Sequence, residues 1–120
     1  PWYGDVDSSI EQTIASLHRL KSIPARTWIA SHNTGLFVEN PGRLWDNFEN
    51  VIYQREERLL NFLNSPKTMQ EILAAWLIYG KPREPKEFFE FNEQAMINKH
   101  IKYLEQQGKI IRNHHYYAKV

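Results

Sequence analysis

The stretch Leu104-Glu105-Gln106-Gln107-Gly108-Lys109-Ile110-Ile111 passes from the end of a predicted helix into a predicted strand. Apolar residues recur at helical spacing up to the start of this stretch. Gly108 then supplies the residue type that commonly ends a helix in the left-handed conformation. Residues 109–112 and 115–119 follow as two short apolar segments around an Asn113-His114 turn, a pattern typical of a β-hairpin. The sequence therefore predicts a helix that leads directly into a terminal hairpin.

Two further features upstream extend this pattern. Thr68-Met69-Gln70-Glu71 is a capping box, in which the first and fourth residues satisfy each other's backbone N–H groups, and it opens a short helix that runs through Leu77. Asn92 is expected to cap the next helix, whose apolar face carries Met96, Ile97, His100, Ile101 and Leu104. Helix, helix and hairpin in this order predict a winged helix-turn-helix over residues 65–120.

Residues 83–91 separate the two helices and contain three phenylalanines. We expect this segment to be a polar loop. Its aromatic side chains are expected to pack on the core and hold the loop in place: Phe88, Phe89 and Phe91.

A long helix is expected over residues 41–64, with Asn40 as its cap and Pro41 as its first residue. Apolar residues form a stripe along it, and Arg55-Glu56-Glu57-Arg58 is expected to face water. Asn64-Ser65-Pro66 ends it. A helix of this length can connect two modules.

The segment Thr27-Trp28-Ile29-Ala30-Ser31-His32-Asn33-Thr34-Gly35 is interpreted as a buried strand followed by a polar turn. A helix precedes it, opened by a capping box of Ser8 and Glu11 and ended by Pro24. A helix that feeds into a strand is half of a β-α-β unit. Loops at the ends of buried strands often carry functional groups, and a neutral imidazole such as that of His32 can bind a metal or move a proton.

Composition limits the class of protein. The 120 residues contain no cysteine, so disulfides and thiolate ligands are excluded, and a cytoplasmic protein is expected. No apolar run is long enough to span a membrane, and no membrane partner is expected. The 15 Lys and Arg against 14 Asp and Glu give a net charge of +1, well below the charge of a strongly basic nucleic-acid-binding domain.

The two halves together resemble the C-terminal third of a metallo-β-lactamase-fold hydrolase, in the glyoxalase II-like and β-lactamase-like group with a C-terminal winged helix. The resemblance rests on Trp2-Tyr3-Gly4-Asp5, on Ser31-His32-x-x-Gly35, on Arg55-Glu56-Glu57-Arg58 and on the pattern of residues 68–110. It implies a mainly α chain with minor β structure: residues 1–40 would be the remnant of the metallo-β-lactamase domain, 41–64 a connecting helix and 65–120 a winged-helix domain.

In this family a binuclear zinc centre, or an iron centre, activates a hydroxide that attacks an ester, thioester, amide or phosphodiester. The resemblance implies that His32 is a metal ligand. A catalytic zinc site needs about three protein ligands, and no other ligand cluster is visible, so this chain alone is expected to be inactive and to contain no catalytic residue. The other ligands are expected on a preceding part of the same protein, which also binds the small-molecule substrate. A homodimer is a further expectation.

The alternative is a nucleic-acid-binding or protein-interaction module without enzymatic activity. In a helix-turn-helix, the second helix enters the major groove. The residues available for this role on the last helix and the hairpin are Lys99, Lys102, Arg112 and Lys119. The absence of an arginine cluster makes nucleic acid the less favoured partner.

Overall fold

The computed structural model describes residues 1–30, 35–37, 39 and 41–120, and these are mainly α-helical with small antiparallel sheets. The helices within the described residues are α1 (Ile10–Lys21), α2 (Gly42–Phe62), α3 (Met69–Ala74) and α4 (Lys86–Gln106). The strands are β1 (Trp28–Ile29), β2 (Leu36–Phe37), β3 (Lys67–Thr68), β4 (Ile110–Asn113) and β5 (Tyr116–Lys119).

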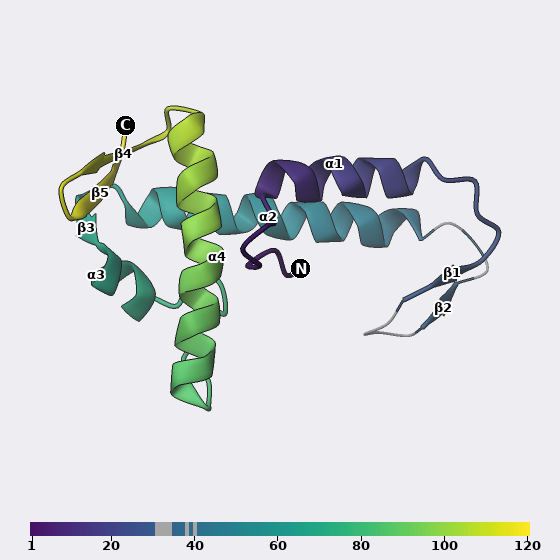
Figure 1. The fold of residues 1–120 in the computed structure, drawn as a ribbon, viewed down its shortest axis with the longest axis horizontal. Coiled ribbons are helices and arrows are strands. Elements are labelled where there is room, and N and C mark those ends of the chain that lie inside the picture. The colour runs from purple at the N-terminus through teal and green to yellow at the C-terminus, as the bar shows by residue number, and fades with distance from the viewer. Residues whose placement is uncertain (31–34, 38, 40) are drawn as a thin grey trace.

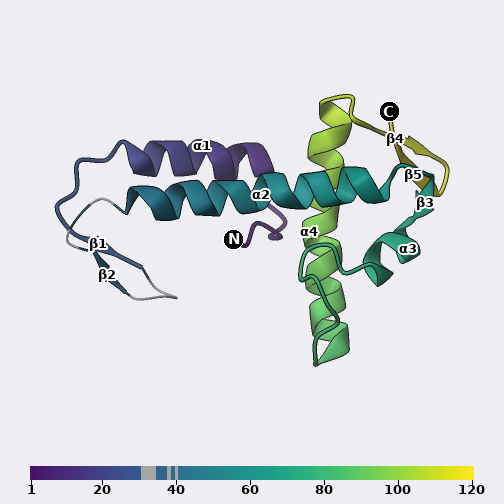
Figure 2. The ribbon, with the colours of Figure 1, turned by 180° about the vertical axis from the view of Figure 1, so that it is seen from behind.

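Helices α1 and α2 lie side by side and run in opposite directions, and α4 crosses α2 (Figure 1). The β1–β2 hairpin projects from one end of this pair, whereas α3 and the second sheet lie at the other end of α2. Figure 2 shows the same cross from behind, with the N-terminus close to the crossing of α2 and α4. The molecule measures 51 × 34 × 24 Å.

The start of α1 differs from the prediction by one residue. Ser9, not Ser8, is the N-cap, and its hydroxyl accepts a hydrogen bond from the backbone N–H of Gln12. The Ser8 hydroxyl instead donates to the carbonyl oxygens of Tyr3 and Asp5. Ser8 is therefore used to hold the segment that precedes the helix.

The predicted buried strand is a short antiparallel hairpin. Trp28 pairs with Phe37, and Ile29 pairs with Leu36. The side chain of Ile29 is 83% exposed, so the strand is not buried, and the described part of the chain gives it no parallel neighbour. Only two residues pair on each side, which is too few to form the central strand of a β-α-β unit.

Helix α2 follows the predicted apolar stripe but differs at two points. Pro41, predicted as the first helical residue, occupies the cap position without a side-chain cap, and the helix begins at Gly42. The predicted cap, Asn40, lies outside the described residues. Glu56, expected to face water, is only 8% exposed, and Arg55 is half-buried. Both lie where other elements cover α2.

The capping box at Thr68 is confirmed. The Thr68 hydroxyl accepts from the N–H of Glu71 at 3.3 Å, and the Glu71 carboxylate accepts from the N–H of Thr68 at 2.7 Å. The helix that follows, α3, ends at Ala74, earlier than predicted. The chain then turns at Trp76, which adopts a left-handed φ of 48°.

The predicted loop over residues 83–91 is wrong, because α4 begins at Lys86 and Asn92 lies inside it. Pro85 occupies the cap position, where the missing N–H costs nothing. Phe88 and Phe91 are 58% and 70% exposed and therefore do not anchor this segment to the core. Phe89 alone is partly covered, with its ring against those of Tyr79 and Phe88.

The C-terminal hairpin is confirmed in outline. Gly108, with a φ of 69°, ends α4, and β4 and β5 follow. The strand order in the sheet is β3-β5-β4, and all neighbours are antiparallel. The turn lies at His114 and His115 rather than at Asn113, which pairs with Tyr116 inside the sheet.

A single group of buried side chains connects all the helices. The cluster includes Tyr3, Ile10, Ile52, Leu59, Leu63, Ile72, Met96, Ile97, Leu104 and Ile110. Residues near the N-terminus thus share a core with α2, α3, α4 and the second sheet. Among the described helices, none is long and apolar enough to cross a membrane.

Candidate functional site

The predicted metal ligand, His32, lies outside the described residues. The ends of the segment that contains it are held together by β1 and β2, and the Ala30 N–H donates to the Gly35 carbonyl at 2.7 Å. Over the parts of the chain that the structure describes, no group of three or more His, Cys, Asp and Glu side chains is placed to hold a metal ion.

An apolar groove of about 880 Å³ lies beside this hairpin. It is formed by the N-terminal residues, the hairpin and the first half of α2. Its wall includes Trp2, Trp28, Phe37, Trp45, Asn47 and Phe48. Three of the four tryptophans of the chain therefore line one groove, whose only polar side chain among these residues is that of Asn47.

Trp28 and Trp45 hold the hairpin against α2. Their ring centroids are 5.3 Å apart at an interplanar angle of 71°, the edge-to-face arrangement that aromatic pairs prefer. The indole N–H of Trp28 is buried and has no hydrogen-bond partner among the residues that the structure describes. A buried donor left without an acceptor costs free energy, so this indole favours an additional acceptor at the groove.

The N-terminal wall of the groove is fixed from behind by Tyr3. The Tyr3 side chain is 1% exposed, and its hydroxyl lies 2.7 Å from Nε2 of His100 on α4. Arg55 on α2 donates to the same hydroxyl at 3.0 Å and to the Pro1 carbonyl at 2.9 Å. Because Pro1 and Trp2 line the groove, this network positions its wall on both long helices.

His100 is held in its neutral form. Burial, together with the positive charge of Arg55, lowers its pKa to about 3. Since Arg55 donates to the Tyr3 hydroxyl, that hydroxyl can donate in turn to Nε2, which leaves the proton of the neutral ring on Nδ1. The Nδ1 atom is buried and finds no hydrogen-bond partner within the described part of the chain. The imidazole is fully enclosed, so we interpret it as a structural acceptor rather than a catalytic base.

Glu93 has a second structural role on α4. Its side chain is fully buried and accepts hydrogen bonds from the N–H groups of Ile78 and Tyr79, at 2.8 and 3.2 Å. Burial raises the pKa of this carboxyl, and the two backbone donors oppose the rise. Glu93 therefore fixes the turn that follows the left-handed Trp76.

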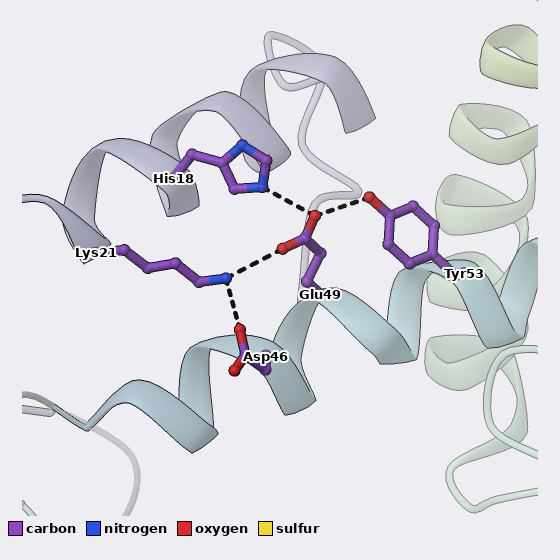
Figure 3. Close-up of polar contacts among 5 residues, drawn as sticks. All are labelled: His18, Lys21, Asp46, Glu49 and Tyr53. Carbon is purple, nitrogen blue, oxygen red and sulfur yellow. Dashed lines mark hydrogen bonds and ion pairs between the residues drawn. The ribbon is translucent and has the colours of Figure 1, made fainter.

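A polar cluster, here called the α1–α2 clasp, joins the first two helices (Figure 3). It consists of His18, Lys21, Asp46, Glu49 and Tyr53. The Glu49 carboxylate contacts His18 Nε2 at 2.9 Å, the Tyr53 hydroxyl at 2.8 Å and Lys21 Nζ at 3.3 Å. Lys21 also donates to Asp46 at 2.7 Å.

The hydrogen bonds to Glu49 shift the pKa values of two groups of the clasp. Hydrogen bonds from Tyr53 and then His18 lower the pKa of the Glu49 carboxyl. The bond to that carboxylate, followed by burial, raises the pKa of Tyr53 to about 12. His18, Lys21 and Tyr53 already contact the Glu49 carboxylate. Lys21 also contacts Asp46, so its charge offsets the repulsion between the two carboxylates. We therefore interpret the clasp as a device that aligns α1 with α2, not as a metal or catalytic site.

The structure uses part of the predicted nucleic-acid face for internal contacts. Lys99 donates to the carbonyl oxygens of Val6 and Ser8 at 3.1 and 2.7 Å, and with Lys102 it shares a small hollow with residues 6–11. The face of α4 that carries both lysines therefore lies against the start of α1. Its approach to a DNA groove is restricted.

The two predicted residues on the hairpin lie on the second sheet. Arg112 donates to the carbonyl of His114 at 3.4 Å, and its guanidinium group lies 5.5 Å from the centre of the Tyr117 ring. Lys119 is exposed at the end of β5. Arg112 and Lys119 belong to the β4–β5 hairpin, whereas Lys99 and Lys102 belong to α4.

Sequence reasoning missed three residues that shape the groove. Trp45 was one apolar residue among many on α2, and only the hairpin contact reveals its role. Arg55 and Tyr3 are far apart in the sequence, and neither lies in a motif that indicates their contact. The available signal in the sequence was that three of the four tryptophans, Trp2, Trp28 and Trp45, lie within the first 45 residues.

Comparisons of this chain with protein-family models, with curated proteins and with solved structures found no match.

Proposed function

We propose that this chain is the C-terminal portion of a binuclear-metal-dependent hydrolase of the metallo-β-lactamase superfamily, with His32 as one metal ligand. The observation that carries the proposal is the hairpin that holds residues 30 and 35 together. The hairpin lies at one end of the molecule, beyond the α1–α2 pair (Figure 1). The resemblance over residues 2–5, 31–35 and 68–110 supports the same assignment.

His32 alone would supply only one of the ligands that a binuclear metal centre needs. A neutral imidazole is a common ligand of zinc and iron. The described residues provide no further ligand group, so the remaining ligands would come from another part of the protein. When bound, two zinc ions, or iron ions, supply a hydroxide nucleophile near neutral pH for an ester, thioester, amide or phosphodiester substrate.

The C-terminal part fits a winged-helix-like domain. Residues 65–120 contain β3, α3, α4, β4 and β5 in that order, and the β3-β5-β4 sheet is compatible with this fold. We interpret it as a packing module of a cytoplasmic enzyme. Its α4 face lies against residues 6–11, which favours this role over nucleic-acid binding.

Metal analysis of the full-length gene product tests the proposal. We expect about two zinc or iron ions per chain in the wild type, a clear loss of metal and hydrolytic activity in His32→Ala, and no change in His115→Ala. His115 is an exposed histidine in the wing turn and provides the matched control. Unchanged metal content in His32→Ala would refute the assignment.

A further inference from the structure

Strand β4 forms one edge of the second sheet (Figure 1). Among the described residues its one strand neighbour is β5, so the other side of its backbone has no strand beside it. We infer that this free edge of β4 binds an extended peptide with acidic side chains, supplied by a partner protein. The inference goes beyond the proposed hydrolase and does not depend on its metal centre.

The first argument is the direction of the backbone groups of β4. In an antiparallel pair of strands, hydrogen-bonded and non-hydrogen-bonded residue pairs alternate. The Val120 N–H donates to the Lys109 carbonyl at 3.0 Å, so this is a hydrogen-bonded pair. By alternation, the N–H and C=O groups of Ile111 point toward β5, whereas those of Ile110 and Arg112 point toward the free edge. An edge with such backbone groups is a template for a further strand.

The second argument is charge. Residues 107–120 contain no Asp or Glu, and their cations are Lys109, Arg112 and Lys119. In the part of the chain that the structure describes, no ion pair involves any of these three. Arg112 is exposed on the edge strand itself, and its guanidinium group lies 5.5 Å from the centre of the Tyr117 ring. A carboxylate opposite Arg112 on an added strand would supply the opposite charge, and such cross-strand pairs stabilise a sheet.

The third argument is the shape of the other face of the sheet. Side chains alternate between the two faces along a strand, so Ile111 lies on the face opposite to that of Arg112. A hollow of about 510 Å³ lies on the face of Ile111, and the residues that line it include Pro66, Ile111, Tyr116 and Ala118. Ile111 is 55% exposed. An apolar side chain opposite Ile111 would contact this surface. The edge therefore fits a strand in which apolar and acidic residues alternate.

Two other occupants match the edge less well. The phosphates of a nucleic-acid strand would neutralise the cations, but they donate no hydrogen bond to the carbonyl groups of Ile110 and Arg112. A second copy of the chain, paired antiparallel through β4, would bring like charges together without a carboxylate between them. An acidic peptide supplies backbone donors, backbone acceptors and the opposite charge. Addition of a peptide strand to an exposed sheet edge is a recurring mode of recognition between proteins.

Peptide binding to the full-length gene product tests the inference. The probe is a peptide of alternating Glu and Val residues. One control peptide has the same composition with the Glu and Val residues in two separate blocks, and another has Lys in place of Glu. We expect calorimetry to show binding of the alternating acidic peptide and at least about tenfold weaker binding of both controls. Amide hydrogen exchange at Ile110 and Arg112 should slow in the complex by more than exchange at Ile111, whose N–H already points toward β5.

Variants at one position separate charge from strand pairing. Arg112→Gln removes the charge and keeps the backbone donor, whereas Arg112→Pro removes both. Because this N–H points away from β5, the proline removes no hydrogen bond of the sheet. We expect binding of the acidic peptide to weaken about threefold in Arg112→Gln and about fivefold further in Arg112→Pro, as the loss of an exposed ion pair and of one hydrogen bond predicts. Lys81→Gln, at an exposed cation outside the sheet, is the matched control and should bind as the wild type does.

Four results would overturn the inference. Absence of binding would exclude an acidic strand at this edge. Equal affinity for the alternating and the block peptide, or for Arg112→Gln and Arg112→Pro, would show that charge alone attracts the peptide and that no strand is added. Displacement of the peptide by a single-stranded DNA oligonucleotide at lower concentration would assign the edge to nucleic acid. Protection of the Ile110 and Arg112 amides without peptide, lost on dilution, would assign it to a second copy of the chain.

Discussion

The Tyr3 hydroxyl lies 2.7 Å from Nε2 of His100, and this contact joins residues 97 positions apart in a fully buried environment. It ties the N-terminal segment to α4, while Arg55 adds α2 to the same network. The stability of the junction therefore depends on an imidazole that must remain neutral.

Acidification should destabilise the protein through His100. The folded state holds the pKa of this group at about 3, below its ordinary value of 6.5. The unfolded chain therefore binds the proton first: the stabilisation is complete above pH 6.5 and is lost as the pH falls toward 3. The unfolding free energy should fall by about 1.4 kcal/mol per pH unit within this window.

Denaturant titrations from pH 7.5 to 5.0 on the wild type and on His100→Gln measure this effect. Burial raises the pKa of Glu56 and Glu93, which changes the pH dependence in the opposite sense. The wild type and His100→Gln share the contribution of Glu56 and Glu93. The difference between their unfolding free energies at each pH therefore isolates the contribution of His100. Parallel pH profiles would contradict the assignment.

Glu93 should stabilise the fold through the hydrogen bonds that its carboxylate accepts rather than through its negative charge. Glu93→Ala leaves the N–H groups of Ile78 and Tyr79 buried without partners, and we expect a loss of about 2–5 kcal/mol. Glu93→Gln retains one acceptor oxygen and should cost less than half as much. Thermal and chemical denaturation of the two variants would reveal the difference. Equal losses would show that the carboxylate charge, and not the hydrogen bonds, holds the turn.

Removal of the clasp carboxylate should lower the pKa of Tyr53. The hydrogen bond to Glu49 raises that pKa to about 12, so in Glu49→Gln we expect a value nearer 10. A difference titration of phenolate absorbance, with Tyr53→Phe as the reference for the other tyrosines, measures this shift. In the wild type, the stabilisation from Tyr53 is present below pH 10 and is lost as the pH rises toward 12. A Tyr53 pKa that does not respond to Glu49→Gln would contradict the contact.

The exposed phenylalanines of α4 should tolerate polar substitution. Phe88→Ser and Phe91→Ser should each change the unfolding free energy by about 0.5 kcal/mol or less, because both side chains are mostly in water. Leu104→Ala, at a fully buried position on the same helix, should cost about 2–5 kcal/mol. A large loss in either serine variant would restore the interpretation of these residues as anchors.

The sequence contained the local signals of the fold but not its long-range contacts. The Thr68–Glu71 box, the Gly108 stop and the stripe of α2 depend on neighbouring residues, and each could be predicted. The start of α4 could not, because the buried Glu93 interrupts its apolar stripe and Pro85 resembles a loop residue. Glu93 is tolerated there only because the backbone of Ile78 and Tyr79 turns toward it.

The candidate site shows the same limit. His32, which residue type and spacing single out as a candidate ligand, lies outside the described residues. The groove could not be predicted, since it depends on contacts among residues far apart in the sequence. Trp28 meets Trp45 only because α1 and α2 lie side by side. Arg55, expected in solvent, donates to Tyr3 only because the N-terminal segment returns to the helical crossing.

The separation between Tyr3 and His100 has a consequence for synthesis on the ribosome. At about 5–20 residues per second, the 97 residues from Gly4 to His100 take about 5 to 20 s to translate. During that interval α1 can already align with α2, whereas the aromatic ring near the start of the chain has no pocket to enter. The ring of Tyr3 therefore stays in contact with water until the final helix emerges.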